Sequence, residues 1–118
     1  MADAFIEHLH DLFAALGPIS TRAMFGGHGL YFDGLIIGIV IDDALYLKTD
    51  DETRAQFEAA GCIPFVYTSQ QQPITTSYWS LPEEAMESAQ AMLPWAKLAF
   101  EAALRKPRPA KKARKPAR

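Results

Sequence analysis

The segment from residue 33 to residue 48 limits the folds open to this chain more than any other part of its sequence. It begins with Asp33-Gly34, continues as the apolar run Leu35–Ile41, turns at Asp42-Asp43 and returns as Leu45–Lys48. Asp-Gly between apolar segments is typical of a two-residue hairpin, because a type I′ turn needs a positive φ at both central residues. A continuous apolar run rich in β-branched residues is typical of a central strand. We therefore expect consecutive antiparallel strands here.

A helix is expected before these strands. Apolar residues recur at helical spacing from residue 5 to residue 16, and Gly17-Pro18 is a typical stop signal. After this stop the pattern changes to that of strands, with one short strand at Arg22–Phe25. The glycine cluster Gly26–Gly29 follows, and it matches neither common phosphate-binding pattern. We interpret it as a bulge or tight turn, since glycine tolerates the backbone angles that such turns need.

The middle of the chain predicts a second helix and a second hairpin. Thr49–Glu52 matches a capping box, in which residues at the two ends of the motif satisfy each other's backbone N–H groups at a helix start. We expect this helix to run to about Ala60. Phe65–Tyr67 and Ile74–Trp79 are typical of two strands joined by the polar loop Thr68–Pro73.

The last helical region begins near Pro82, where two glutamates follow a proline. Pro94 lies within this region. Proline removes a helical hydrogen bond and clashes with the preceding turn, so we expect a break or kink there, followed by a longer helix to Leu104. The buried face of that helix is expected to carry Leu93, Ala96, Phe100 and Leu104.

The predicted order is helix, three or four strands, helix, two strands, helix. Mostly hairpin connections imply one antiparallel sheet, and we therefore predict a two-layer α+β fold with the helices mainly on one face of the sheet. We assign residues 1–104 to this single domain, a length within the usual range for one core. Because Leu35–Ile41 is apolar throughout, the other face is expected to be solvated, partly covered by helices or paired with a second subunit in a homodimer.

Charge divides the chain at residue 104. Residues 1–104 contain four basic residues and all 14 acidic residues, a net charge of −10, whereas residues 105–118 contain the other eight basic residues and no acid, a net charge of +8. Residues 106–118 consist only of Lys, Arg, Pro and Ala. Such a segment cannot bury apolar area, so we expect residues 105–118 to form a disordered basic tail.

The composition argues against several classes of protein. One cysteine, Cys62, allows no internal disulfide and fits a reducing compartment. The longest apolar run has eight residues, whereas a membrane-spanning helix needs about 20. The first residues are acidic and provide no basic leader, which argues against a signal peptide. We expect a cytoplasmic protein without membrane contact.

No arrangement of side chains in the sequence predicts catalysis. The histidines His8, His10 and His28 lack the spacing of metal ligands, and we expect neither a metal nor a cofactor. Cys62 has no assignable partner and is interpreted as structural. Asp50, Asp51 and Glu52 could bind a cation or act as acid and base, but their place at a helix start is explained by capping and the helix dipole. We therefore expect no catalytic residues.

The stretch Arg22-Ala-Met-Phe-Gly-Gly-His-Gly-Leu-Tyr31 resembles the signature of the TfoX N-terminal domain family, an R-x-M-F-G-G-x-G-x-Y pattern before an Asp-Gly hairpin. The resemblance continues through Asp43–Lys48 and Phe57–Gly61, resumes at Pro64-Phe65 and Ser77–Trp79, and covers roughly residues 5–104. It implies an α+β domain. It also implies a role in regulating natural competence in bacteria together with the transcription machinery. The longer members of the family carry a second, C-terminal domain, where this chain has its basic tail.

Two groups of residues are candidates for binding. Arg22, Gly26, Gly27 and His28 are expected to form a loop that binds a protein partner. Arg22 also belongs to a polar-aromatic set with Tyr31, Tyr78 and Trp79, which are expected either to bind a ligand or partner or to pack between sheet and helices. Tail cations can neutralise phosphates without sequence preference, and we expect nucleic-acid contacts from Lys106, Arg108, Lys111, Lys112, Arg114, Lys115 and Arg118.

Three functions remain open at this point. The first is a non-enzymatic regulatory module that binds a protein through its domain and non-specific nucleic acid through its tail. The second is a small-molecule-binding domain or unrecognised enzyme with a pocket between the glycine loop and Trp79, lined by Tyr31, Tyr78 and Trp79. The third is a homodimeric scaffold without nucleic acid.

Overall fold

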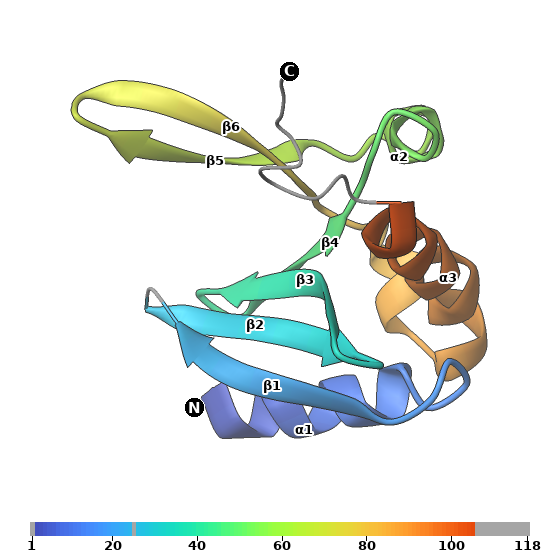
Figure 1. Ribbon diagram of the computed structural model, residues 1–118. Coiled ribbons are helices and arrows are strands. Elements are labelled where there is room, and N and C mark those ends of the chain that lie inside the picture. Colours follow the sequence, from blue (N-terminus) through green and yellow to red (C-terminus); the bar gives the residue numbers. More distant parts are fainter. Residues whose placement is uncertain (1, 25, 106–118) are drawn as a thin grey trace, which may run out of the picture.

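The computed structural model describes residues 2–24 and 26–105, which form one antiparallel sheet of six strands with three α-helices (Figure 1). The elements are α1 (Ala2–Leu12), β1 (Ile19–Met24), β2 (Gly27–Phe32), β3 (Leu35–Ile41), β4 (Ala44–Lys48), α2 (Arg54–Ala59), β5 (Pro64–Ser69), β6 (Gln72–Trp79), the 3-10 helix η1 (Glu83–Met86) and α3 (Ala89–Arg105). The predicted α+β class and the predicted order of helices and strands are confirmed.

The sheet follows the chain closely, with the strand order β1-β2-β3-β4-β6-β5. The predicted hairpin at Asp33-Gly34 is confirmed, with positive φ angles of 54° and 79° at these two residues. Asp42 and Asp43 form the next turn in the same left-handed conformation, which aspartate tolerates better than most residues. Short turns of this kind keep β1 to β4 side by side.

Two predicted loops are shorter in the structure. Gly27 already pairs with Met24, so most of the glycine cluster belongs to β2 and not to a loop. The expected polar loop Thr68–Pro73 is a two-residue turn at Gln70-Gln71, with positive φ at both residues. Glutamine is not a usual residue for this conformation, so the sequence did not signal the turn.

The two faces of the sheet differ in what covers them. Directly opposed residues of an antiparallel pair carry side chains on the same face. One row of paired residues runs Thr21–Leu30–Gly38–Leu47–Trp79 across five strands. Leu30 and Leu47 are fully buried and Trp79 is nearly so, which places this row on the helix-covered face.

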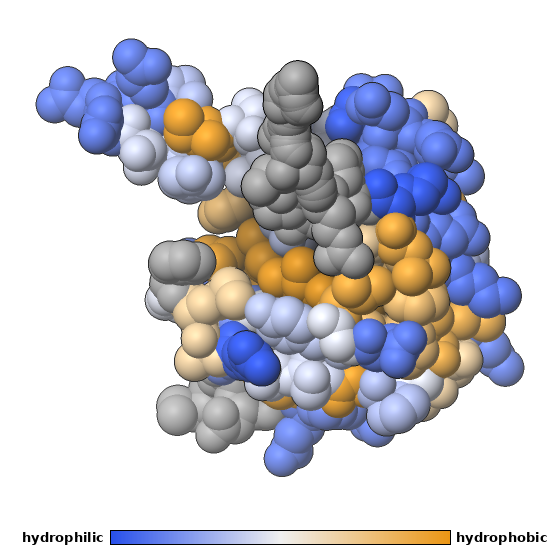
Figure 2. Space-filling view, viewed as in Figure 1, coloured by the Kyte–Doolittle hydropathy of each residue, from blue (hydrophilic) through white to orange (hydrophobic). Residues whose placement is uncertain are grey.

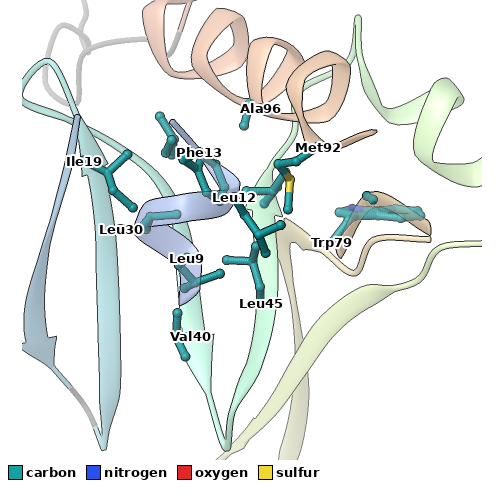
Figure 3. Close-up of a cluster of buried hydrophobic side chains, with 14 of the residues drawn as sticks. Leu9, Leu12, Phe13, Ile19, Leu30, Val40, Leu45, Trp79, Met92 and Ala96 are labelled. Atoms are coloured by element: carbon teal, nitrogen blue, oxygen red, sulfur yellow. The ribbon is translucent and has the colours of Figure 1, made fainter. Parts of the chain in front are cut away.

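The core lies between that face and the helices (Figure 3). Leu9, Leu12 and Phe13 reach it from α1 and the turn that follows, and Met92 and Ala96 reach it from α3. Aromatic contacts extend it at both ends, with Phe32 against Phe100 and Phe57 against Trp95 at ring-centroid distances of 4.8 and 5.0 Å. The apolar stripe predicted for the first helix is thus the stripe that is buried.

The capping box before α2 lies one residue later in the chain than predicted. Asp50 Oδ1 accepts hydrogen bonds from the N–H groups of Glu52 and Thr53, and Thr53 Oγ1 accepts one from the Asp50 N–H. The reciprocal pair is therefore Asp50 with Thr53 and not Thr49 with Glu52. Thr49 is instead buried, and its hydroxyl donates to the Ser77 carbonyl at 2.8 Å.

The last helix differs from the prediction at Pro94. The break falls earlier, at Glu87-Ser88, and α3 runs through Pro94 to Arg105. The Ser88 hydroxyl accepts a hydrogen bond from the Ala91 N–H, so the helix is capped before the proline. Burial of Met92 and Ala96 then holds the helix to the core on both sides of Pro94.

The buried face of α3 is also corrected in part. Ala96 is fully buried as expected, whereas Leu93 and Phe100 are half-buried and Leu104 is 60% exposed. Alanines at positions 99, 102 and 103 replace the expected large side chains in the contact with the sheet. None of the helices that the structure describes is long and apolar enough to cross a membrane.

Candidate functional site

The face of the sheet opposite the helices, here called the outer face, is the most distinctive surface of the domain. A second row of paired residues, Arg22–Gly29–Ile39–Tyr46, crosses β1 to β4 on this side. Within the six described strands the only Asp, Glu, Lys or Arg residues are Arg22 and Lys48. All 14 acidic residues of the chain lie in helices, turns and connections. The outer face is therefore cationic and apolar in a domain whose net charge is strongly negative.

Arg22 and Tyr31 form the first contact on this face. The Arg22 guanidinium carbon lies 5.4 Å from the centroid of the Tyr31 ring, which is a cation–π distance. Gly29, between them in the sheet, has no side chain, and a Cβ there would stand only 2.8 Å from Met24 Cε and 3.0 Å from Tyr31 Cε1. The side chains of Met24 and Tyr31 therefore meet over the bare backbone of Gly29.

Lys48 and Tyr78 form a matching contact on the same outer face, where β4 pairs with β6. Lys48 Nζ lies 5.3 Å from the Tyr78 ring centroid and donates a hydrogen bond to Ser77 Oγ at 3.1 Å. Burial raises the pKa of the Tyr78 hydroxyl, and the electrostatic influence of Tyr31 raises it further. By strand register Tyr31 and Tyr78 both lie on the outer face, with a cation over each ring.

An aromatic line leads from the outer face onto the β5–β6 hairpin. The Tyr46 and Phe65 rings are 4.9 Å apart, and Phe65 stacks with Tyr67 at 6.4 Å. The half-buried residues Ile36, Ile39 and Ile41 belong to the same outer face. Figure 2 shows the resulting apolar surface between the hairpin above and strands β1 and β2 below.

The structure separates the four residues that were expected to bind a partner together. Arg22 is exposed on the outer face, whereas His28 pairs with Ala23 and Val40 on the helix-covered face. Gly26 is exposed in the turn, and Gly27 is part of β2. Of this set, only Arg22 presents a charged side chain to the outer surface.

The polar-aromatic set is divided in the same way. Arg22, Tyr31 and Tyr78 lie on the outer face. Trp79, the next residue of β6, points to the helix-covered face and is only 7% exposed in the core. The three rings of the expected ligand pocket therefore do not line one cavity. Sequence reasoning missed Lys48 and Tyr46. Strict alternation in Leu45–Lys48, with Leu45 and Leu47 inward, was the signal that could have placed them on the outer face.

Gly27 is required by the fold, which leads to a stability prediction. A Cβ at Gly27 would collide with the Val40 carbonyl oxygen of the neighbouring strand. Replacing Gly27 with alanine should cost about 1–3 kcal/mol of unfolding free energy, because the backbone of β3 cannot move aside cheaply. At Gly26 a Cβ meets no atom within 4 Å, and only its φ of 79° is unfavourable, so alanine there should cost about 1 kcal/mol. Urea unfolding of both variants measures the difference. Equal losses would contradict this role of Gly27.

A second electrostatic feature joins the end of α3 to the turn before α2. Arg105 Nε donates to Asp50 Oδ2 at 2.8 Å and lies 3.3 Å from Glu52 Oε2. The hydrogen bond from Arg105 holds the pKa of the Asp50 carboxyl below its ordinary value. Arg105, expected in the tail, is thus the last residue of α3 and is tied to the domain.

The hollow beside this ion pair is small and open. It measures about 220 Å³ and is lined by Lys48, Thr49, Asp50, Asp51, Arg54, Ser77 and Ala102. Sites for small molecules usually measure about 300–1,000 Å³ and are mostly apolar. This hollow is smaller than that range, and its lining carries both signs of charge.

The remaining candidates for chemistry lie apart from one another. Cys62 is buried, and burial raises the pKa of its thiol, which disfavours the reactive thiolate. His8 and His10 are exposed on α1, and His28 lies across the sheet. Among residues 2–24 and 26–105 no three His, Cys, Asp or Glu side chains are grouped to hold a metal ion. The seven expected nucleic-acid contacts in the tail lie outside the described residues.

Comparison with known proteins agrees with the resemblance seen in the sequence. The family model of the TfoX N-terminal domain matches residues 11–103. The DNA transformation protein TfoX1 of Aliivibrio fischeri is 32% identical over 82 residues, which is 66% of this chain. The match spans 39% of the length of that relative. Because the family model covers most of the chain, including all six strands, α2 and nearly all of α3, the protein belongs to the TfoX N-terminal domain family.

Proposed function

We propose that this chain is a non-enzymatic regulatory module of the cytoplasm that binds a protein through its outer face and acts in the control of DNA transformation. The observation that carries the proposal is the distribution of charge: two cations lie over tyrosine rings beside apolar side chains, on an outward sheet face whose strands contain no acid. Such a surface is typical of a protein–protein interface, because aromatic and arginine side chains are enriched at interface centres.

Two further observations support the role in DNA transformation. The chain belongs to a family with a relative named as a DNA transformation protein. The hollow beside the Arg105–Asp50 ion pair, at about 220 Å³, is smaller than a usual small-molecule site, which favours a protein as the binding partner. The transcription machinery is the class of partner that the family resemblance favours.

Deletion of the gene in its host tests this proposal. The transformation frequency of the deletion strain is expected to change and to return to its original value when the chain is restored on a plasmid. Transcript levels of the genes for DNA uptake should follow the same pattern, because a regulator acts before uptake begins. A deletion strain with unchanged transformation frequency and unchanged transcripts would contradict the proposed role.

We further propose that residues 106–118 attach the module to nucleic acid. Seven cations in this segment can neutralise several phosphates, and the affinity should then fall steeply with salt. Fluorescence anisotropy of labelled duplex DNA should show salt-dependent binding by the full chain and none by a version ending at Arg105, which keeps the Arg105–Asp50 ion pair.

The matched variant changes Lys111, Lys112, Arg114 and Lys115 to alanine. It should lower the slope of log affinity against log salt by about 1 for each phosphate contact that is lost. If the slope of this variant equals that of the unaltered chain, these four cations do not contact phosphate.

A further inference from the structure

The β5–β6 hairpin, here called the arm, extends away from the rest of the sheet (Figure 1). It joins the sheet through two pairs only, Leu47 with Trp79 and Lys48 with Tyr78. Beyond these pairs β6 has extra residues relative to β5, and the Thr76 hydroxyl donates to the Phe65 carbonyl at 2.8 Å. This irregularity bends the arm out of the sheet, as bulges generally do. All residues from 66 to 75 are exposed.

The arm lacks the features that usually protect an exposed hairpin. Residues 59–82 contain no Asp, Glu, Lys, Arg or His. Val66, Tyr67 and Ile74 are 45%, 47% and 37% exposed. Native proteins normally place charges on such edges to prevent pairing with other chains. An uncharged protruding arm with exposed apolar residues is therefore typical of a segment that is covered by a partner.

The same chain carries a surface that fits this arm. The outer face presents Ile39, Ile41 and Tyr46, and it continues onto the arm through Phe65 and Tyr67. Figure 2 shows this apolar surface below the arm, with the arm standing out from the molecule. A protrusion and an apolar sheet face thus occur side by side on one molecule. This is the arrangement that allows two copies to bind each other reciprocally about a two-fold axis.

Charge favours a second copy as the occupant. Residues 1–104 carry a net charge of −10, so two copies repel each other at surfaces where the acids of one face the acids of the other. The arm and the strands of the outer face contain no acid. They are the surfaces on which two copies can approach with the least repulsion.

We infer that two copies of this chain form a dimer by exchanging arms, each arm packing its Tyr67 and Ile74 on the outer face of the other copy. The inference rests on the proposed function, because it names the protein that occupies the outer face.

Sedimentation velocity of the full chain at physiological salt tests the dimer. The mass should rise with concentration to twice the 13.1 kDa of one chain. Tyr67→Asp and, separately, Ile74→Asp should shift the chain to the monomer at the same concentration, because each places an acid on an uncharged interface. Both positions are exposed on the arm, so folding should be retained, and circular dichroism of each variant should match that of the unaltered chain. Gln56→Glu is the matched control, since it adds the same charge on exposed α2 and should leave the dimer intact.

Photo-crosslinking locates the contact. A photoreactive phenylalanine analogue at position 67, in a mixture of isotopically labelled and unlabelled chains, should join the arm of one copy to residues 27–48 of the other. A mass of one chain throughout a titration to millimolar concentration would overturn the inference. A dimer that survives both arm variants would overturn the arm exchange. In either case, a regulatory effect of the chain in its host would leave the proposed function standing with a different protein on the outer face.

Discussion

Replacing Phe13 with alanine is expected to lower the free energy of unfolding by about 3–5 kcal/mol, the cost of a large cavity in a packed core. Phe13 is fully buried among side chains of α1, the sheet and α3 (Figure 3). Because small domains are stable by about 5–15 kcal/mol, this one change removes a large share of the total. Urea unfolding followed by circular dichroism measures the loss.

The matched variant is Phe65→Ala on the outer face. Phe65 is half-buried and contacts Tyr46 and Tyr67 only at the edge of the sheet, so this change should cost about 1–2 kcal/mol. The comparison separates the side of the sheet that holds the fold together from the side available for binding. If both phenylalanines cost the same, the core is not confined to the helix-covered face.

Reversing the charge of both outer-face cations, with Arg22→Glu and Lys48→Glu, is expected to abolish most of the chain's effect on DNA transformation. The free energy of unfolding is expected to change little. The double variant places two acids on strands that contain none, and acids that face a desolvated contact cost several kcal/mol. Each loss of about 1.4 kcal/mol lowers affinity tenfold. The effect of the chain on transformation frequency in its host should therefore fall by at least about tenfold. Unfolding free energy should change by about 1 kcal/mol or less, as for most surface substitutions.

The chain offers a control with the same change of charge. Residues 1–104 contain four basic residues, and the other two, Arg54 and Lys97, lie on α2 and α3. Arg54→Glu with Lys97→Glu should leave the transformation frequency near that of the unaltered chain. Equal losses in the two double variants would mean that total charge, and not the outer face, controls the activity.

The fold was predictable because its local signals agree with one another. The Asp33-Gly34 turn, the apolar strand Leu35–Ile41 and the helical stripe of the first helix each specify their element, and the structure contains all three. Hairpin connections then leave few topologies open. The errors occurred where tertiary packing outweighs local preference. Pro94 remains inside a helix because its neighbours are buried against the sheet.

The site was only partly predictable, since a sequence does not show which strand face is covered. Arg22 and Tyr31 were identified as candidates. Arg22 and His28 were expected in one loop, but β2 already begins at Gly27, and the two side chains lie on opposite faces of the sheet. Lys48 and Tyr78 belong together only through the pairing of β4 with β6, which joins residues distant in sequence. No local pattern encodes that pairing.

The measurement that tests the outer face most directly is photo-crosslinking in host cells, with a photoreactive phenylalanine analogue at position 31 and a control chain carrying it at position 8. Position 31 lies on the outer face, whereas His8 is exposed on α1. We predict adducts from position 31 that survive nuclease and contain protein peptides, and few or none from position 8. Adducts that nuclease removes, or equal crosslinking from both positions, would contradict a protein-binding outer face.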